Sequence, residues 1–224
     1  MPPRKTLLLI DDHPVVCAGI RLSLDGSATF EVCGEADTVP IALEKARVLR
    51  PDLVLLDLLL NEKDGFNLIE GILDLLPDTK IVVYSMLNEM VYAQRAIQAG
   101  ARGYVMKSEP LASVLLALET VEQDGYYVST QVQRAVLANM AGQKKTGAAN
   151  PLDILSNREL EVFRLLGLGL SSAQVAGKLN LNVKTVGSFR ERLKNKLGVD
   201  TSRELERQAE AFLKTGRLSP EDGP

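Results

Sequence analysis

Residues 52–65 read DLVLLDLLLNEKDG, and the pattern of this segment is the strongest indication of the fold of the N-terminal part of the chain. It begins with a short run of Leu and Val between polar residues, which is typical of a strand buried on both faces of a sheet. Asp57 stands where that strand should end. Because open parallel sheets bind ligands outside the carboxyl ends of their strands, Asp57 is a candidate functional carboxylate.

Three other stretches follow the same design of an apolar run that ends in polar side chains. They are TLLLIDD at 6–12, KIVVYS at 80–85 and RGYVMKS at 102–108. Their polar ends are Asp11 and Asp12, Ser85, and Lys107. If the four strands are neighbours, three acids, one hydroxyl and one ammonium collect at one edge of the sheet. Such a set can hold a divalent cation such as Mg²⁺, a nucleophilic carboxylate and a phosphoryl group.

Strand and helix patterns alternate over residues 1–125, which predicts an α/β domain with a doubly wound parallel sheet. The five strands are expected near 5–11, 29–34, 52–57, 80–85 and 102–106. The helices between and after them are expected near 14–25, 38–49, 65–76, 88–99 and 110–123. Residues 126–151 are expected to form a linker that contains a helix at 130–140.

The composition is that of a globular protein, and we expect a cytoplasmic one without a membrane partner. A length of 224 residues suffices for one or two domains. No apolar run approaches the roughly 20 residues that span a bilayer. The two cysteines form neither a disulfide framework nor a metal-binding spacing.

Charge is distributed unevenly along the chain. Residues 1–130 hold 11 basic and 19 acidic residues, whereas residues 131–224 hold 15 basic and 10 acidic residues. A basic C-terminal part hints at a nucleic-acid partner. A charged helical face is equally common as a solvated surface, so the charge alone leaves both interpretations open.

A small all-helical domain is expected at 152–217, followed by a tail at 218–224. Ser156 and Glu159 form a capping box that begins a helix ending near Leu168. Three further helices have expected caps at Ser171 or Ser172, at Asn182, and at Thr201 or Ser202. The second and third helices are joined by a short turn and make a helix-turn-helix candidate.

The third of these helices, at 183–198, is basic and amphipathic. Its apolar residues recur at spacings of three and four, and they are Val186, Phe189, Leu193 and Leu197. The other face would meet a major groove, and it carries Lys184, Gly187, Ser188, Glu191 and Lys194. A solvated surface helix would show the same pattern.

Residues 5–123 resemble the receiver domain of two-component response regulators. The matching stretches are LLLIDDHPVVCAGI, PDLVLLDLLLNEKDG, KIVVYS and AGARGYVMKS. The resemblance implies a flavodoxin-like fold and a phosphoryl group that Asp57 accepts from a sensor histidine kinase. The resemblance further implies that Asp11 or Asp12 holds Mg²⁺ together with Asp57 and the Leu59 carbonyl. It also implies that Ser85 and Lys107 bind the phosphoryl group, and that Ser85 and Tyr104 form a switch. His13 is interpreted as a surface residue at a helix start.

Residues 155–215 resemble the LuxR-type helix-turn-helix of NarL/FixJ-class regulators, and the segments VKTV and KNKLGV carry the match. The resemblance implies a homodimer that binds double-stranded promoter DNA. The DNA contacts that it implies are Lys184, Thr185, Ser188, Glu191 and Lys194. Arg190 is expected to add a phosphate contact, and residues 205–213 are a candidate dimer face.

These interpretations predict a phosphorylation-controlled, DNA-binding transcriptional regulator. It would perform no catalysis beyond phosphotransfer to Asp57 and loss of that phosphoryl group. One alternative is a phosphohydrolase with Asp57 as nucleophile, but Leu59 stands two residues later, where a second acid would be useful. Another is a protein-binding module that never touches DNA. Leu59 and Leu87 are expected to exclude the attacking water, so the phosphoryl group should be long-lived.

Overall fold

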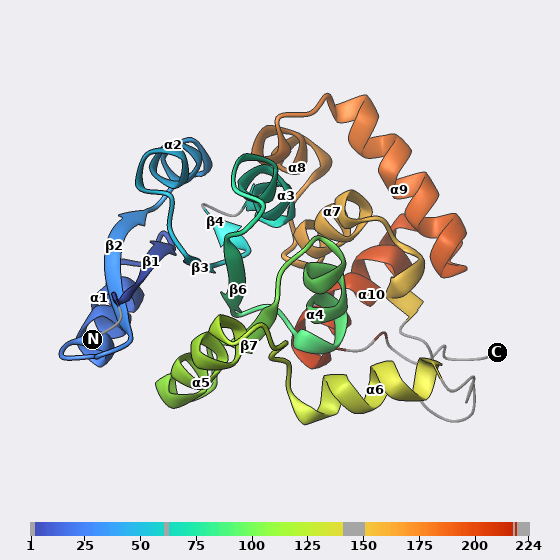
Figure 1. Cartoon of the computed structure of the whole chain (residues 1–224). Helices are drawn as coiled ribbons and strands as arrows, with labels where there is room; N and C mark the ends of the chain where they lie inside the picture. Colours follow the sequence, from blue (N-terminus) through green and yellow to red (C-terminus); the bar gives the residue numbers. More distant parts are fainter. Residues whose placement is uncertain (1–2, 61–62, 141–150, 217, 219–224) are drawn as a thin grey trace. The chain divides into compact units, whose positions relative to one another are not determined.

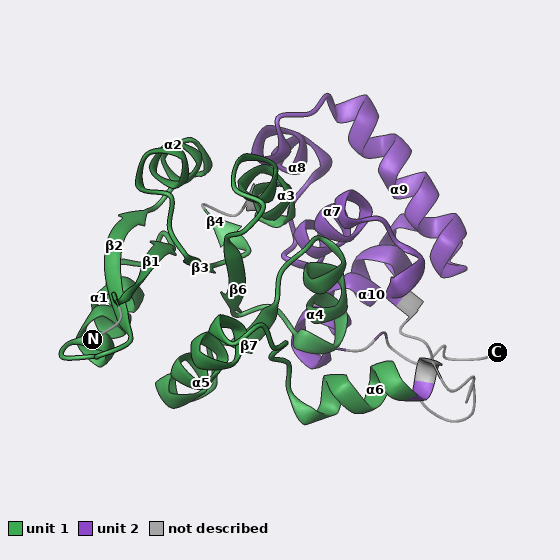
Figure 2. Cartoon of the chain, in the orientation of Figure 1, with its two compact units in different colours: residues 1–137 green, residues 138–224 purple. Residues whose placement is uncertain are grey.

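A computed structural model describes residues 3–60, 63–140, 151–216 and 218. The chain divides into two compact units, residues 1–137 and 138–224, which Figure 2 shows in different colours. Residues 141–150 of the predicted linker and 219–224 of the predicted tail lie outside the described residues. No helix in the described ranges combines the length and the apolar character that crossing a bilayer requires.

The N-terminal unit contains a five-stranded parallel sheet in the order β2-β1-β3-β6-β7 (Figure 1). The strands are β1 (Lys5–Ile10), β2 (Phe30–Ala36), β3 (Leu53–Leu56), β6 (Lys80–Ser85) and β7 (Gly103–Met106). This confirms the predicted doubly wound α/β fold. The order reverses between β1 and β3, and a reversal of this kind opens the crevice in which such sheets bind ligands.

Helices connect the strands or follow the last of them, at nearly the predicted positions. They are α1 (Pro14–Leu24), α2 (Val39–Leu49), α3 (Phe66–Leu75), α4 (Glu89–Gln98), α5 (Leu111–Glu122) and α6 (Thr130–Met140). A two-residue antiparallel pair, β4 (Leu59–Leu60) and β5 (Lys63–Asp64), directly follows Asp57 and was not predicted. Each of its strands has only two residues, so the alternation of apolar and polar residues that marks a strand cannot be seen in the sequence.

The sheet is buried on both faces, as its apolar strands require. Leu7, Leu9 and Leu55 belong to one hydrophobic cluster with side chains from α1 and α5. Because successive side chains of a strand point to opposite faces, Leu8 and Val54 face the other helical layer, and both are fully buried. The polar residues that follow the strands are therefore held by a rigid scaffold.

The C-terminal unit is all-helical. It contains a short 3₁₀ helix, η1 (Pro151–Ile154), followed by α7 (Asn157–Gly167), α8 (Ser172–Leu179), α9 (Val183–Leu197) and α10 (Ser202–Thr215). The N-caps are Ser156, Ser171, Asn182 and Thr201, and each side chain accepts a hydrogen bond from the first turn of its helix. The predicted caps are thus confirmed. Of the alternatives left open by the sequence, Ser171 rather than Ser172 caps α8, and Thr201 rather than Ser202 caps α10.

Helices α7 and α10 form the core of the C-terminal unit. Their backbones approach closely, because a Cβ atom on Gly167 would lie 2.5 Å from the carbonyl oxygen of Ala209. The rings of Phe163 and Phe212 pack 5.9 Å apart at a tilt. The expectation of a dimer face at 205–213 is wrong for Ala209, Phe212 and Leu205, since all three side chains are buried within the unit.

The apolar stripe of α9 is narrower than predicted. Val186 and Leu193 are fully buried, as expected. Phe189 and Leu197 are only half-buried. The guanidinium of Arg192 lies 4.4 Å from the centre of the Phe189 ring, which shields that ring from water.

Candidate phosphoacceptor site and DNA interface

The carboxyl ends of β1, β3, β6 and β7 bring the predicted pocket residues together. Asp57 directly follows β3 and is only 3% exposed. Asp11 and Asp12 follow β1, Ser85 ends β6, and Lys107 follows β7. These positions lie on four neighbouring strands of one sheet, so residues far apart in the sequence share one site.

Lys107 is the cation at the centre of this site. Its Nζ lies 2.6 Å from Oδ2 of Asp57 and 2.6 Å from Oδ2 of Asp11. Burial by itself lowers the pKa of Lys107, but its hydrogen bonds and charge interactions with the two carboxylates outweigh burial and raise that pKa. The ammonium therefore stays charged at neutral pH.

Asp57 is oriented by donors on both of its oxygens. The hydroxyl of Ser85 donates to Oδ1 at 2.7 Å, and the amide N–H of Leu59 donates to the same oxygen at 3.0 Å. Lys107 donates to Oδ2. Ser85 is completely buried, so its hydroxyl depends on Asp57 as an acceptor. Leu59 contacts the site through this hydrogen bond from its amide, whereas the sequence predicted that its carbonyl would contact a metal.

A divalent cation fits the acidic side of the site. Asp11, Asp12, His13 and Asp57 each offer a donor atom, and these atoms lie within 4.8 Å of one another. Three of the four donors are carboxylate oxygens, the ligands that Mg²⁺ prefers. The imidazole of His13 is 64% exposed, but its Nδ1 lies 2.9 Å from Asp12 and 3.1 Å from Asp11. This contact was not predictable from the sequence, because the pattern marked His13 only as the start of a helix.

Tyr104 connects the site to the loop that follows β6. Its side chain is 1% exposed, and its hydroxyl donates a hydrogen bond of 2.9 Å to the carbonyl of Leu87. Burial, and secondarily the neighbouring charged groups, raises the pKa of Tyr104 well above its ordinary value. The hydroxyl therefore stays a neutral donor throughout the physiological range.

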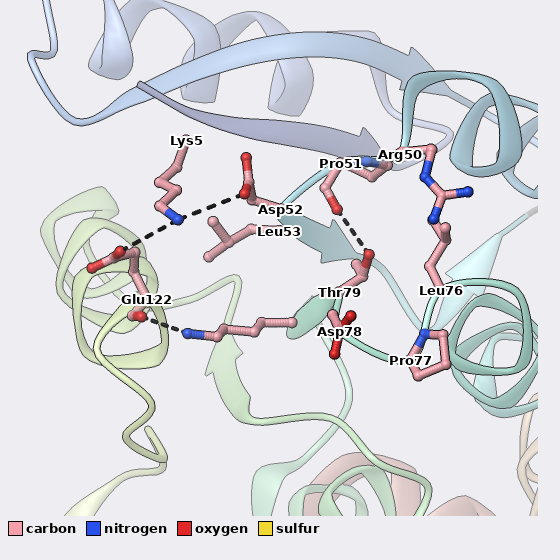
Figure 3. A pocket seen from close by; sticks show the side chains of 11 residues that line it. Lys5, Arg50, Pro51, Asp52, Leu53, Leu76, Pro77, Asp78, Thr79 and Glu122 are labelled. Carbon is pink, nitrogen blue, oxygen red and sulfur yellow. Dashed lines mark hydrogen bonds and ion pairs between the residues drawn. The ribbon is translucent and has the colours of Figure 1, made fainter. Parts of the chain in front are cut away.

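A cavity of about 230 Å³ lies at the other end of the strands, away from Asp57 (Figure 3). Its charged groups are mostly paired with one another. Lys5 lies 3.6 Å from Asp52 and 3.9 Å from Glu122, and Thr79 donates to the Pro51 carbonyl. Lys5 and Asp52 are 43% and 44% exposed, whereas Lys107 and Asp57 are 7% and 3% exposed, so this cavity lacks the buried carboxylate and ammonium of the Asp57 site.

The predicted DNA contacts all lie on α9, but they differ in accessibility. Lys184, Thr185 and Ser188 are exposed near the beginning of the helix. Lys194 is 18% exposed and pairs with Glu191 at 2.9 Å. All of these residues except Thr185 belong to the face that the sequence pattern assigned to a groove.

Arg190 has a different environment from the other predicted contacts. Its side chain is 13% exposed, and its guanidinium pairs with Glu206 of α10 at 2.5 Å. Arg192, which was not among the predicted contacts, is 54% exposed. The sequence pattern did not single out Arg192 as a DNA contact. The orientation of its side chain depends on the contact of its guanidinium with the Phe189 ring, which helical spacing does not reveal.

The fold and the site define a class: an aspartate-centred α/β domain joined to a helix-turn-helix domain. Residues 7–119 match the response regulator receiver domain, and residues 153–209 match the bacterial regulatory proteins of the luxR family. The chain therefore belongs to the response regulators that carry a LuxR-type DNA-binding domain. This membership favours the regulator over the alternative phosphohydrolase.

Related proteins match over most of the length of the chain. A protein of Pseudomonas aeruginosa is 35% identical over 191 residues, which are 85% of this chain and 90% of that protein. The oxygen regulatory protein NreC of Staphylococcus epidermidis is 31% identical, covering 89% of this chain and 94% of NreC. A solved structure with a similar fold is that of RcsB from Salmonella enterica serovar Typhimurium, bound to a promoter in the presence of the phosphomimetic BeF3⁻. The RcsB sequence is 25% identical, the match covers 91% of this chain and 97% of the RcsB chain, and the TM-score is 0.67.

Proposed function

We propose that Asp57 accepts a phosphoryl group from a sensor histidine kinase and that this modification controls binding of α9 to promoter DNA. The observation that carries the proposal is the position of Asp57. Its buried carboxylate lies between the Ser85 hydroxyl and the Lys107 ammonium, at the same sheet edge as Asp11 and Asp12. This arrangement provides a nucleophile together with groups that bind the oxygens of a phosphoryl group.

In the proposed reaction, a carboxylate oxygen of Asp57 attacks phosphorus, and the bond from phosphorus to the donor breaks. The product is an acyl phosphate on Asp57. Lys107 and Ser85 then bind the phosphoryl oxygens with the charge and the hydroxyl that now contact the carboxylate. When bound by Asp11, Asp12 and Asp57, Mg²⁺ would supply positive charge that offsets the carboxylates and the phosphoryl oxygens.

The switch follows from the position of the Ser85 hydroxyl. This hydroxyl now donates to Asp57 at 2.7 Å, and its Oγ accepts a long contact of 3.5 Å from the amide of Leu87. When the hydroxyl turns to donate to a phosphoryl oxygen, Oγ moves away from that amide, and the Leu87 loop loses this support. Tyr104 donates to the Leu87 carbonyl, so its side chain responds to the same change. Phosphorylation would thereby shift a population between two arrangements.

The DNA-binding part of the proposal rests on the exposed face of α9. Lys184, Thr185 and Ser188 lie at the beginning of this helix, the part that enters the major groove in helix-turn-helix proteins. RcsB is described as dimers bound to DNA, and we infer the same homodimeric state on DNA for this chain. A cytoplasmic location is consistent with these partners.

The test is labelling of the full-length protein with radioactive acetyl phosphate in the presence of Mg²⁺. Wild-type protein and the Asp25→Asn control, changed at an exposed aspartate, should both be labelled. Asp57→Asn should incorporate no label, and full labelling of this variant would contradict the assignment.

A mobility shift with promoter fragments should show tighter binding after phosphorylation, whereas a protein-binding module would give no shift. Turnover of a generic phosphate ester would instead support the phosphohydrolase.

A further inference from the structure

Residues 126–129, which we call the strap, run beside the edge strand β7 after α5 ends. The amide of Tyr127 donates to the Arg102 carbonyl at 2.9 Å, and the amide of Tyr104 donates to the Tyr127 carbonyl at 2.8 Å. Gly103 and Tyr127 thus form an isolated parallel bridge. Because β7 has β6 on one side only, the strap covers hydrogen-bonding groups that would otherwise be unpaired at the sheet edge.

The beginning of the strap is held firmly. Asp124 has a left-handed backbone with φ of 63°, and it pairs with Lys80 at 3.0 Å and with Arg102 at 3.1 Å. Gly125 donates its amide to the Thr120 carbonyl at 2.9 Å. This turn fixes the strap where it leaves α5, so any detachment must begin at the other end.

The other end of the strap is attached to α4 by a single side-chain hydrogen bond. The hydroxyl of Ser129 donates to Oε1 of Glu89 at 2.7 Å. The Oγ atom of Ser129 in turn accepts the amide N–H of Val132 at 3.2 Å, so Ser129 also caps the first turn of α6. One residue therefore connects the beginning of α6 to the beginning of α4.

Both attachments of the strap depend on the loop that follows β6. Leu87 accepts the hydroxyl of Tyr104, whose backbone amide holds the strap, and Glu89 accepts the hydroxyl of Ser129. Leu87 and Glu89 are separated by one residue. A displacement of this segment would disturb both attachments at once, and the segment begins two residues after Ser85.

We propose that the strap is a latch that phosphorylation of Asp57 releases. This inference rests on the proposed function, because it needs the Leu87 loop to respond to Ser85. In the latched state, the strap holds the beginning of α6 to the N-terminal unit. Release removes the Tyr104–Tyr127 pairing and the Ser129–Glu89 bond, so the chain that leads to the DNA-binding unit gains freedom. Each such hydrogen bond contributes only about 1 kcal/mol net, and a difference of this size suits a shift between populated states.

Hydrogen exchange of the full-length protein tests the latch directly. Tyr104 of β7 provides the reporter, because its amide donates to the strap, and Arg102, which directly precedes β7, provides the control, because its amide donates to Ile81 of β6. We expect addition of Mg²⁺ and beryllofluoride to speed exchange of the Tyr104 amide by roughly tenfold. Exchange of the Arg102 amide should stay unchanged. Equal protection of the Tyr104 amide in both states would overturn the latch.

Reciprocity gives a second measurement with matched variants. If the phosphoryl analogue weakens the latch, then weakening the latch must favour the analogue by the same factor. Glu89→Ala and Ser129→Ala should each bind beryllofluoride about fivefold more tightly than wild type, and the double variant should gain no more than either alone. Thr130→Ala, which removes an exposed neighbouring hydroxyl, should bind as wild type does.

The outcomes separate the latch from the proposed function. Unchanged beryllofluoride affinity in Glu89→Ala and Ser129→Ala, or gains that add in the double variant, would overturn the latch alone. The proposed function would then still stand on Asp57 labelling. Failure of the wild-type protein to bind beryllofluoride at all would overturn both.

Discussion

The ammonium of Lys107 lies 2.6 Å from the Asp57 carboxylate, and both side chains are more than nine-tenths buried. Lys107 also pairs with Asp11, so its removal leaves two buried carboxylates without their cation. We expect Lys107→Gln to lower the free energy of unfolding by about 3 kcal/mol in the absence of metal. The same variant should bind Mg²⁺ more tightly, on the order of tenfold, because no ammonium competes for the carboxylates.

The measurement is urea unfolding followed by tyrosine fluorescence, with and without Mg²⁺. The five tyrosines all lie between residues 84 and 127, so this signal reports the N-terminal unit. Lys80→Gln is the control, since Lys80 pairs with Asp124, which is 75% exposed, and such pairs contribute less than about 1 kcal/mol. Equal destabilisation by the two substitutions would contradict the special role of Lys107.

The phosphoryl group on Asp57 should be lost slowly. Leu59 and Leu87 are both half-buried, and each stands two residues after a pocket residue. Neither side chain can hold an attacking water by a hydrogen bond. We expect Leu59→Asn or Leu87→Glu to speed the loss by about tenfold or more, judged from the usual gain from a positioned acid or base.

The decay of labelled protein after removal of the donor measures this rate. Leu22→Asn, changed at an exposed position on α1, should decay as wild type does. If both polar variants at the pocket also decay at the wild-type rate, the two leucines only pack against their loops.

Lys184 and Arg190 should contribute differently to DNA binding although both lie on α9. Lys184 is exposed, so Lys184→Gln should reduce the slope of log affinity against log salt by about 0.9. Arg190 is held by Glu206, so Arg190→Gln should leave the slope unchanged and destabilise the C-terminal unit by about 1 kcal/mol. Fluorescence polarisation of a labelled promoter fragment over a salt series measures both slopes. Loss of slope in Arg190→Gln would show that Arg190 leaves Glu206 to reach a phosphate.

The stability of the C-terminal unit should depend on the charge of Glu159. Burial by itself raises the pKa of Glu159, but hydrogen bonds from Lys196 and from the Ser156 backbone outweigh it and lower that pKa. A carboxyl with a lowered pKa in the folded state stabilises above its unfolded value of about 4.3, and this stabilisation is lost as the pH falls further. We expect a loss of about 1 kcal/mol between neutral and strongly acidic pH.

Glu159→Gln keeps the acceptor of the capping box but removes the charge, so its stability should not show this loss. Hydrogen exchange of the α7 amides across the acidic range measures the difference. Glu210→Gln serves as the control, because Glu210 pairs with Lys214 on the open surface, where solvent screens the interaction. An acid profile of Glu159→Gln that matches wild type would exclude this role of the carboxylate.

Much of the fold follows from local patterns in the sequence. The run Leu53–Leu56 is apolar on both faces, which only a covered parallel strand satisfies, and Ser156 with Glu159 fixes the beginning of α7. The pocket was predictable because its residues all occupy the same relative place, the end of a strand. The β4–β5 pair and the contact of His13 with Asp11 and Asp12 were not, since both depend on the local path of a loop.

Local spacing was enough to predict most core-facing residues and the polar residue at each strand end, because a side chain's direction along a strand or helix depends on its spacing. The partner that each side chain contacts depends instead on how the elements pack in three dimensions. The tertiary structure paired Arg190 with Glu206, buried Phe212 against Phe163, and joined Ser129 to Glu89. These contacts connect elements that pack together through the whole hydrophobic core, so no local spacing encodes them.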